Sequence, residues 1–356
     1  IITGLVGSEM CIRDRYPNVV TDFHEMGTNS TYFFEPMKPN ASLKPLIPDE
    51  NYSVLSPIFA KYYSKALDSI GSFYYTKESF DETYPGYGSS YPDVQGALAI
   101  LFEQGSSRGH LQETNYGTIS FGFTIRNQYL SSIATVEAAV DNKNLLRDYQ
   151  KRFFSSSVTE FSSDKTKAYE FGDLYDMNRN KAFIDKLILH NIKVYRNKEK
   201  FIVPVKQQQS RMVKNFFETY DKYVDSVFYD ASAWSVSNFY NMKSKKLRSF
   251  ISESEITDTD NLIKTLKVNK SDYAYIIDWN DYNSPAALNH LQKNDIVTYS
   301  AFKPFKIKVD NANKGVQFNY GSILVPVSKQ KISSDKLYEI IKAVSYTHLT
   351  LPTMIG

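Results

Sequence analysis

Two groups in this sequence are of the kinds that carry out hydrolysis, an imidazole and a carboxylate. Asp22-Phe23-His24 follows a short apolar run, and Glu103 closes the apolar run GALAILFE. An imidazole can bind zinc through one ring nitrogen, and a carboxylate can take a proton from a metal-bound water. Asp22 lies two residues before His24, hence on the same strand face, where it or a backbone carbonyl could orient the ring.

Each group also has an ordinary structural interpretation. A single histidine at a strand end is more often a hydrogen-bonded structural residue than a metal ligand. Glu103 could emerge into solvent or pair with Arg108, because a buried carboxylate without a partner is costly. Glu113 is a second candidate base, although its surroundings are more polar and loop-like.

A loop rich in tyrosine and glycine precedes the strand of Glu103. Its sequence from Tyr84 to Tyr91 is YPGYGSSY. Glycines permit unusual backbone angles, and tyrosines would place hydroxyl groups on an arm over a site. The same residues could equally form an aromatic turn that packs on the surface.

The elements that must position these groups follow from periodicity and from turn residues. The long segment between Gly27 and Tyr52 is expected to be a rim or lid. The helix after it should begin at Ser56 as N-cap, with Pro57 in its first turn, and stop at Gly71. The expected elements are a strand over Val19–Phe23, a helix over Ser56–Ile70, a buried strand over Gly96–Glu103 and a long helix over Tyr129–Phe154.

Composition excludes several classes of protein. Lys and Arg total 42 and Asp and Glu 39, so the net charge of +3 argues against a nucleic-acid binder, which needs a concentrated basic face. The single cysteine, Cys11, lies in an unusual N-terminal segment, which argues against disulfides and thiol catalysis. No apolar run reaches the ~18–20 residues of a membrane span.

The two ends of the chain do not continue the periodicity of their neighbours. Residues 1–15 contain GLVGSEMCIRDR and residues 345–356 contain SYTHLTLPTMIG, both of which resemble translated sequencing adapters. We therefore expect both segments to be artefacts and the chain to be cut on both sides. The alternative is a genuine N-terminal strand and a genuine tail.

The second half of the chain contains a candidate internal repeat, over residues 168–207 and 274–330. Leu187 and Ile192 are five residues apart, as are Leu291 and Ile296, and a tyrosine follows each isoleucine by three residues. Each copy predicts a strand, a helix and two further strands, so that two copies would form an α/β sandwich. Two ordinary β-α-β units with chance similarity are the alternative, and the α/β class is the same in both cases.

The order of the motifs over residues 16–155 resembles the zinc carboxypeptidase family, the carboxypeptidase A-like metallopeptidases. D-F-H at residues 22–24 resembles the family's D-x-H strand end, and TYPGYGSSYPD followed by GALAILFEQGS resembles its mobile tyrosine loop and catalytic strand. The resemblance implies that His24 is a zinc ligand, Glu103 the general base and Tyr84 the tyrosine that contacts substrate, with Tyr87 as the alternative. The stretch FTIRN resembles the part that closes the fold and implies a substrate contact for Arg126.

The sequence also departs from that family. The family's H-x-x-E motif supplies the first two zinc ligands well before the D-x-H strand, and its substrate arginines lie between them; neither is found before His24. A catalytic zinc ion needs about three protein ligands. We therefore expect this chain to be an N-terminally truncated, inactive fragment that binds zinc weakly or not at all.

Residues 165–344 resemble the class I glutamine amidotransferase-like domain that follows the peptidase domain in bacterial, exported members. A working amidotransferase needs a nucleophilic cysteine, which this region lacks, so we expect no glutamine hydrolysis. His190 and His290 at the predicted helix ends are interpreted as capping or surface residues. The aromatic-acidic segment Phe228–Trp234 is interpreted as domain-packing core or, as the alternative, a binding face.

The expected fold is therefore α/β, the C-terminal half of a carboxypeptidase-like mixed-sheet domain followed by an amidotransferase-like α/β sandwich. The expected function is zinc-dependent hydrolysis of a peptide near a free carboxylate, in a periplasmic or secreted protein without a membrane span. The alternative is a non-catalytic peptide- or glycan-binding protein on a dead carboxypeptidase scaffold. The oligomeric state does not follow from the sequence.

Overall fold

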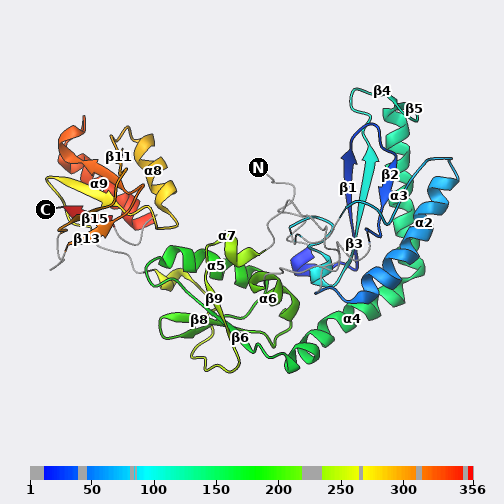
Figure 1. Ribbon diagram of the computed structural model, residues 1–356, viewed down its shortest axis with the longest axis horizontal. Coiled ribbons are helices and arrows are strands. Elements are labelled where there is room, and N and C mark those ends of the chain that lie inside the picture. Colours follow the sequence, from blue (N-terminus) through cyan, green and yellow to red (C-terminus); the bar gives the residue numbers. More distant parts are fainter. Residues whose placement is uncertain are drawn as a thin grey trace. The chain divides into compact units, whose positions relative to one another are not determined.

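The chain forms two compact units. The computed structural model describes residues 12–38, 46–80, 84, 86–218, 235–263, 268–309, 315–347 and 352–355, and the statements below concern these residues. Unit 1 comprises residues 1–168 and 204–239, and unit 2 comprises residues 169–203 and 240–356. Helices and small sheets occur in both, which confirms the predicted α/β class (Figure 1). The predicted domain limits at 16–155 and 165–344 stay a prediction.

The sheet of unit 1 has three strands in the order β1-β3-β2. β1 (Val19–Met26) and β3 (Leu98–Gly105) are parallel, and β2 (Tyr32–Phe34) is antiparallel to β3. Every residue of β3 is buried, which explains its nearly unbroken apolar sequence. The prediction that the first strand stops at His24 is wrong, because β1 keeps its pairing with β3 as far as Met26.

Two helices cover one face of this sheet, α2 (Ser56–Asp68) and α3 (Phe121–Asp141) (Figure 1). Their buried side chains meet Leu98, Ile100 and Phe102 in one apolar core. Ser56 is the first residue of α2 and not its N-cap, because the π-helical turn η1 (Asn51–Leu55) leads directly into the helix.

The predicted long helix over Tyr129–Phe154 is wrong, because the structure has two helices there. α3 ends at Asp141 and α4 (Lys143–Glu160) follows it. At the break, Asn142 has φ −106° and its Nδ2 donates to Ala138 O at 2.8 Å, so its side chain competes with the helical hydrogen bonds. α3 begins twenty-one residues earlier, where Ser120 Oγ accepts from Phe123 N at 3.2 Å as an N-cap.

The predicted repeat corresponds to two four-stranded sheets with the same strand order. Corresponding elements of the two copies occupy corresponding places. Each sheet has one additional edge strand, which in the second sheet is β15, within the segment 345–356 that the sequence predicts to be an artefact. The first order is β7 (Tyr195–Asn197), β8 (Lys200–Pro204), β6 (Ala168–Phe171), β9 (Ser244–Leu247), and the second is β11 (Tyr299–Ser300), β14 (Ile323–Pro326), β10 (Ala274–Ile277), β15 (Pro352–Ile355).

The helices of the two copies, α5 (Met177–Leu189) and α8 (Ser284–Lys293), end in the same way. The Ile192 amide donates to Leu187 O and the Ile296 amide donates to Leu291 O, both at 3.1 Å. The residue before each isoleucine has a left-handed backbone, with φ of 58° and 55°. This ending is common among helices, so the internal repeat stays a prediction.

The loops that follow β6 and β10 join the two copies within unit 2. Asp176 Oδ2 accepts from Tyr282 N at 2.9 Å, and Asn178 Nδ2 donates to Asp281 at 3.0 Å. Burial raises the pKa of Asp176, although the Arg179 amide and guanidinium oppose this shift. Tyr240 also packs against Phe183 and Tyr282, with ring centroids 5.3 Å and 6.2 Å apart, so polar and aromatic contacts both join the two copies.

His190 and His290 both lie at the ends of helices in unit 2. His190 is the C-cap residue of α5, buried, with Nδ1 at 2.7 Å from Lys186 O. His290 lies in the last turn of α8. The segment Phe228–Trp234 lies outside the described residues. No helix in the described part of the chain has the length and apolar character needed to cross a membrane.

Arg211 connects α6 (Ser210–Phe217) to α4 within unit 1. In the sequence, α6 follows β8, which belongs to a sheet of unit 2. Its side chain is 4 % exposed and donates to Ser157 Oγ and Glu160 Oε2 at 2.6 Å and to Phe153 O at 3.0 Å. The guanidinium also lies over the Phe153 ring at 4.8 Å. A buried cation with this many partners explains why residues 204–239 belong to unit 1.

We expect Arg211→Met to lower the free energy of unfolding by about 3 kcal/mol, because it leaves buried acceptors without a donor. Arg152→Met is the matched control: Arg152 pairs with Glu50 at 2.5 Å but is 53 % exposed, so its loss should cost less than about 1 kcal/mol. Urea unfolding of both variants measures the difference. Equal effects would show that α6 is not anchored through Arg211.

Candidate functional site

The pairing of β1 with β3 places His24 opposite Glu103 and Asp22 opposite Leu101. Side chains paired across neighbouring strands point to the same face of a sheet. Phe102, the next residue along β3, lies in the core under α2 and α3. Alternation along the strand therefore puts Asp22, His24 and Glu103 together on the face away from those helices.

Asp22 holds the His24 ring. Its Oδ1 lies 2.9 Å from His24 Nε2, with the imidazole 55 % exposed and the carboxylate 22 % exposed. A proton on Nε2 directed at this carboxylate leaves a lone pair on Nδ1. The ring is thus oriented in the way that metal-binding histidines usually are, with one nitrogen turned to a carboxylate and the other available.

Glu103 is nearly buried and incompletely satisfied. The residue is 9 % exposed, and its Oε2 has no hydrogen-bond partner within the described ranges. Burial raises the pKa of Glu103 above its ordinary value, the Asp22 charge adds to the rise, and His24 opposes it. No ion pair between Glu103 and Arg108 occurs in the part of the chain that the structure describes, so the alternative of pairing with Arg108 is not supported.

Tyr75 is a neighbour of Glu103 that sequence reasoning missed. It forms a bridge with Phe33, which is itself opposite Glu103. Burial raises the pKa of the Tyr75 hydroxyl, and the negative charge of Glu103 adds to it. Its hydroxyl lies 3.2 Å from Met26 Sδ. The signal that could have revealed it is the aromatic run FYY after α2, which suits a short extended edge.

The backbone of the tyrosine loop contacts the candidate site at Gly88. A Cβ atom at Gly88 would overlap the Asp22 carboxylate, so the backbone here lies directly against the Asp22 side chain. Tyr84 and Tyr87 pack edge to face, with ring centroids 5.2 Å apart at 80°. Ser90 Oγ donates to Tyr84 O and closes the turn. The predicted substrate contacts of both tyrosines stay predictions.

Two other candidates lie elsewhere. Arg126 lies on α3, against the opposite face of the sheet, with its guanidinium 5.0 Å from the Phe123 ring centroid. Glu113 lies on β4 (Leu111–Thr114), which pairs with β5 (Gly117–Ser120), and accepts from Thr118 Oγ1 at 2.8 Å in an exposed hairpin. The geometry therefore favours Glu103 over Glu113 as the base and does not bring Arg126 to His24.

The donors at this site do not complete a zinc centre by themselves. A catalytic zinc ion takes about three protein ligands. Here Nδ1 of His24 is the one available imidazole donor, and Asp22 is engaged with the other nitrogen. Within the described ranges, no group of three or more His, Cys, Asp or Glu side chains is arranged to hold a metal ion. His24 can be one ligand of such a centre and not the whole of it.

Comparison of the chain with protein-family models, with curated proteins and with solved structures gives no match in any of the three. The likeness to zinc carboxypeptidases therefore rests on the sequence motifs of residues 16–155 alone.

We expect the Glu103→Gln variant to become more stable than the wild-type protein as pH rises. A raised pKa means that folded Glu103 holds its proton more tightly than the unfolded chain does. The free energy of unfolding should therefore fall as pH rises through the window that starts near the ordinary value of 4.5, and the glutamine variant lacks this loss. At pH 7 the variant should be more stable than wild type by about 1 kcal/mol.

Urea unfolding between pH 4 and 8 measures this difference, with Glu113→Gln as the exposed control. The control should follow the wild-type curve throughout. A Glu103→Gln variant whose advantage shrinks with rising pH would contradict the burial argument.

Proposed function

We propose that this chain carries part of a metallocarboxypeptidase-type hydrolytic site that cleaves peptide or amide bonds. The observation that carries the proposal is the position of His24 opposite Glu103, with Asp22 on the ring nitrogen that faces away from a prospective ligand. An imidazole and a carboxylate of raised pKa on one strand face are the groups that hydrolysis through an activated water requires.

The chain's own residues have distinct parts in this proposal. Asp22 fixes the imidazole of His24, which offers Nδ1 as one ligand to an ion whose other ligands the described residues do not supply. Glu103 accepts the proton of the attacking water, and its raised pKa makes it a stronger base than an exposed glutamate. The loop of Tyr84 and Tyr87 covers the site from the side of Asp22.

The proposed substrate class follows from the family resemblance, whereas the proposed chemistry follows from the geometry of the site. An exopeptidase acting on a peptide near its free carboxylate, in a periplasmic or secreted protein, is what the family resemblance implies. Arg126 lies on α3, which covers the other face of the sheet, so the carboxylate-binding group would be supplied by residues other than Arg126.

A non-catalytic peptide- or glycan-binding protein is the second candidate. The observation in its favour is that the described donors do not form a metal centre. On this hypothesis Glu103 would be a ligand-binding carboxylate, and its substitution would change binding without any turnover to lose.

The protein expressed from its full gene tests both hypotheses. On the first, Glu103→Gln should lower hydrolysis of a peptide substrate about 10²–10⁴-fold and keep the zinc content, because a general base contributes that much to a rate. His24→Ala should lose zinc as well as activity, since a ligand is removed. Glu113→Gln is the control and should retain both.

Elemental analysis and a peptidase assay give the two measurements. Unchanged turnover in the glutamine variant would remove Glu103 as the base. A wild-type protein without zinc and without turnover would favour the binding hypothesis.

A further inference from the structure

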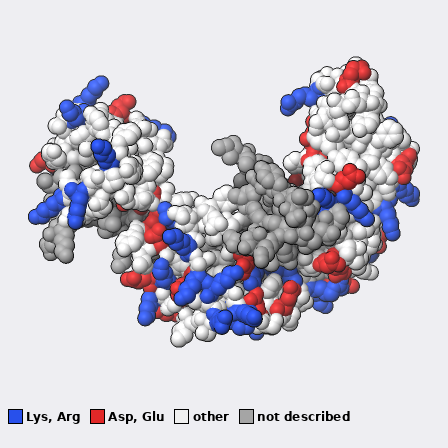
Figure 2. All heavy atoms as spheres, in the orientation of Figure 1, with Lys and Arg blue, Asp and Glu red and all other residues white. Residues whose placement is uncertain are grey.

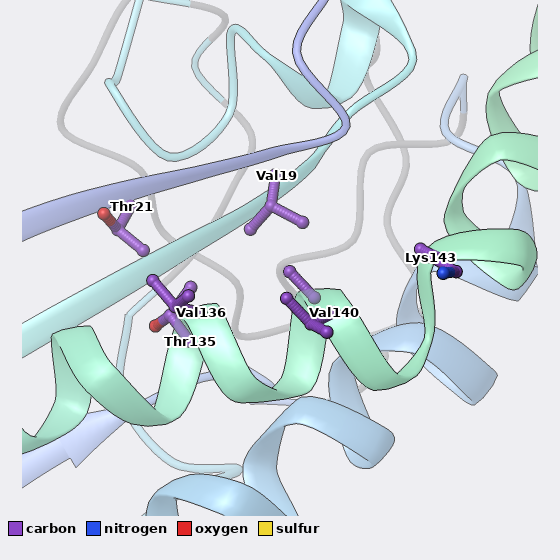
Figure 3. Close-up of a pocket in the computed structure, with 7 residues that line it drawn as sticks. Val19, Thr21, Thr135, Val136, Val140 and Lys143 are labelled. Atoms are coloured by element: carbon purple, nitrogen blue, oxygen red, sulfur yellow. The ribbon is translucent and has the colours of Figure 1, made fainter.

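The two faces of the sheet of unit 1 can be assigned from the side chains of β1. Val19 and Thr21 point toward α3, on the side of the helices (Figure 3). Because the direction of the side chains alternates along a strand, the even-numbered residues of β1 point to the other face. Met26 therefore lies on the face of the candidate site, as does Glu103 on β3.

Tyr75 comes onto the same face from beyond β2. Phe33 on β2 is opposite Glu103 on one side and forms a bridge with Tyr75 on the other, and bridged residues point to the same face. The Tyr75 hydroxyl nevertheless reaches β1, where it lies 3.2 Å from Met26 Sδ. Since β3 lies between β1 and β2, the contact of these two side chains passes over β3.

The contact between Tyr75 and Met26 passes β3 beside Glu103. Met26 is opposite Gly105, which comes two residues after Glu103 and has no side chain. Glu103 is therefore the side chain of β3 nearest to this contact. Burial raises the pKa of the Tyr75 hydroxyl and the negative charge of Glu103 adds to the rise, which agrees with a short distance between the two groups.

The hydrogen-bonding partners of the two groups are unequal. The Tyr75 hydroxyl donates to a thioether sulfur, which is a weak acceptor. Glu103 Oε2 is buried and has no hydrogen-bond partner within the described ranges. Figure 2 shows mainly uncharged side chains over β1 and β3 on the side turned to the viewer. A hydroxyl donates to a carboxylate more strongly than to a neutral acceptor, so a change of acceptor from Met26 Sδ to Glu103 Oε2 is favourable.

We propose that Tyr75 is a positioning residue of the candidate site, whose hydroxyl turns from Met26 Sδ to Glu103 Oε2 and holds the carboxylate in place. With Oε2 engaged, Oε1 is the oxygen left to accept a proton from water. The unbranched Met26 side chain has three rotatable bonds and adapts readily when the hydroxyl leaves it.

This inference rests on the proposed hydrolytic function for the use of the arrangement. The hydrogen bond itself can be measured without turnover, so that the two proposals can fail separately.

A double-mutant cycle on the stability of the 356-residue chain tests the hydrogen bond. We expect Tyr75→Phe to lower the folding equilibrium constant about fivefold more in the wild-type background than in the Glu103→Gln background, because a neutral amide is a weaker acceptor than a carboxylate. Urea unfolding near pH 8 measures all four proteins. The matched control is Tyr74→Phe, whose ring packs against Phe34 on the helix side of the sheet and should show no such coupling.

Met26→Leu separates the proposed bond from the contact with Met26. The substitution removes the sulfur acceptor and keeps the volume of the side chain. On the proposal, the Tyr75 hydroxyl keeps Glu103 as its acceptor, so the coupling between Tyr75→Phe and Glu103→Gln should persist in this background. If the hydroxyl served only to hold Met26, Met26→Leu and Tyr75→Phe would destabilise the chain equally and the coupling would be absent.

Turnover of the protein expressed from its full gene tests the positioning role. Tyr75→Phe should lower kcat about tenfold and leave KM within about twofold, because the position of the base matters in the reaction and not in substrate binding. Zinc content should stay that of wild type. In the Glu103→Gln background Tyr75→Phe should cause no further loss, and Tyr74→Phe should retain the wild-type kcat.

The two measurements distinguish the two proposals. Coupling in a protein without turnover would support the hydrogen bond and overturn the hydrolytic function that uses it. An active protein whose Tyr75→Phe variant keeps the wild-type kcat would overturn the positioning role. Absence of coupling, or the same coupling for Tyr74→Phe, would overturn the hydrogen bond.

Discussion

The parallel pairing of β1 with β3 is the constraint on which the candidate site depends. Because β3 is buried along its whole length, its register with β1 is fixed by apolar contacts on one face. The same register then determines that His24 and Glu103 share the other face. A shift of one residue would turn the imidazole toward α3 and leave Glu103 opposite Phe23 or Glu25.

The elements around this pair act on Glu103 through burial more than through charge. Tyr75 and Phe33 exclude water from one side, and Asp22 adds a negative charge that is itself turned to His24. A carboxylate with one unpartnered oxygen is costly in a structural position. Its position near the carboxyl end of the central strand β3, beside an oriented imidazole, is the reason for the functional proposal.

The sequence predicted the existence of the main elements better than their ends. The apolar run before Glu103 identified β3, and residue spacing identified the helices α5 and α8, because these signals come from burial and local turns. The helix break at Asn142 could not be predicted from periodicity, since it is marked by the backbone of a single residue, whose side chain donates to Ala138 O. Tyr75 was missed because its place beside Phe33 is set by tertiary contact.

The buried side and the exposed side of α3 carry different kinds of side chain. Its inner side uses small and polar side chains, among them Asn127, which donates to Gln104 Oε1 at 2.9 Å and so satisfies a buried amide on β3. That close approach leaves no room for large apolar residues on the inner side. The large residues are on the outer side instead, next to an open strand edge.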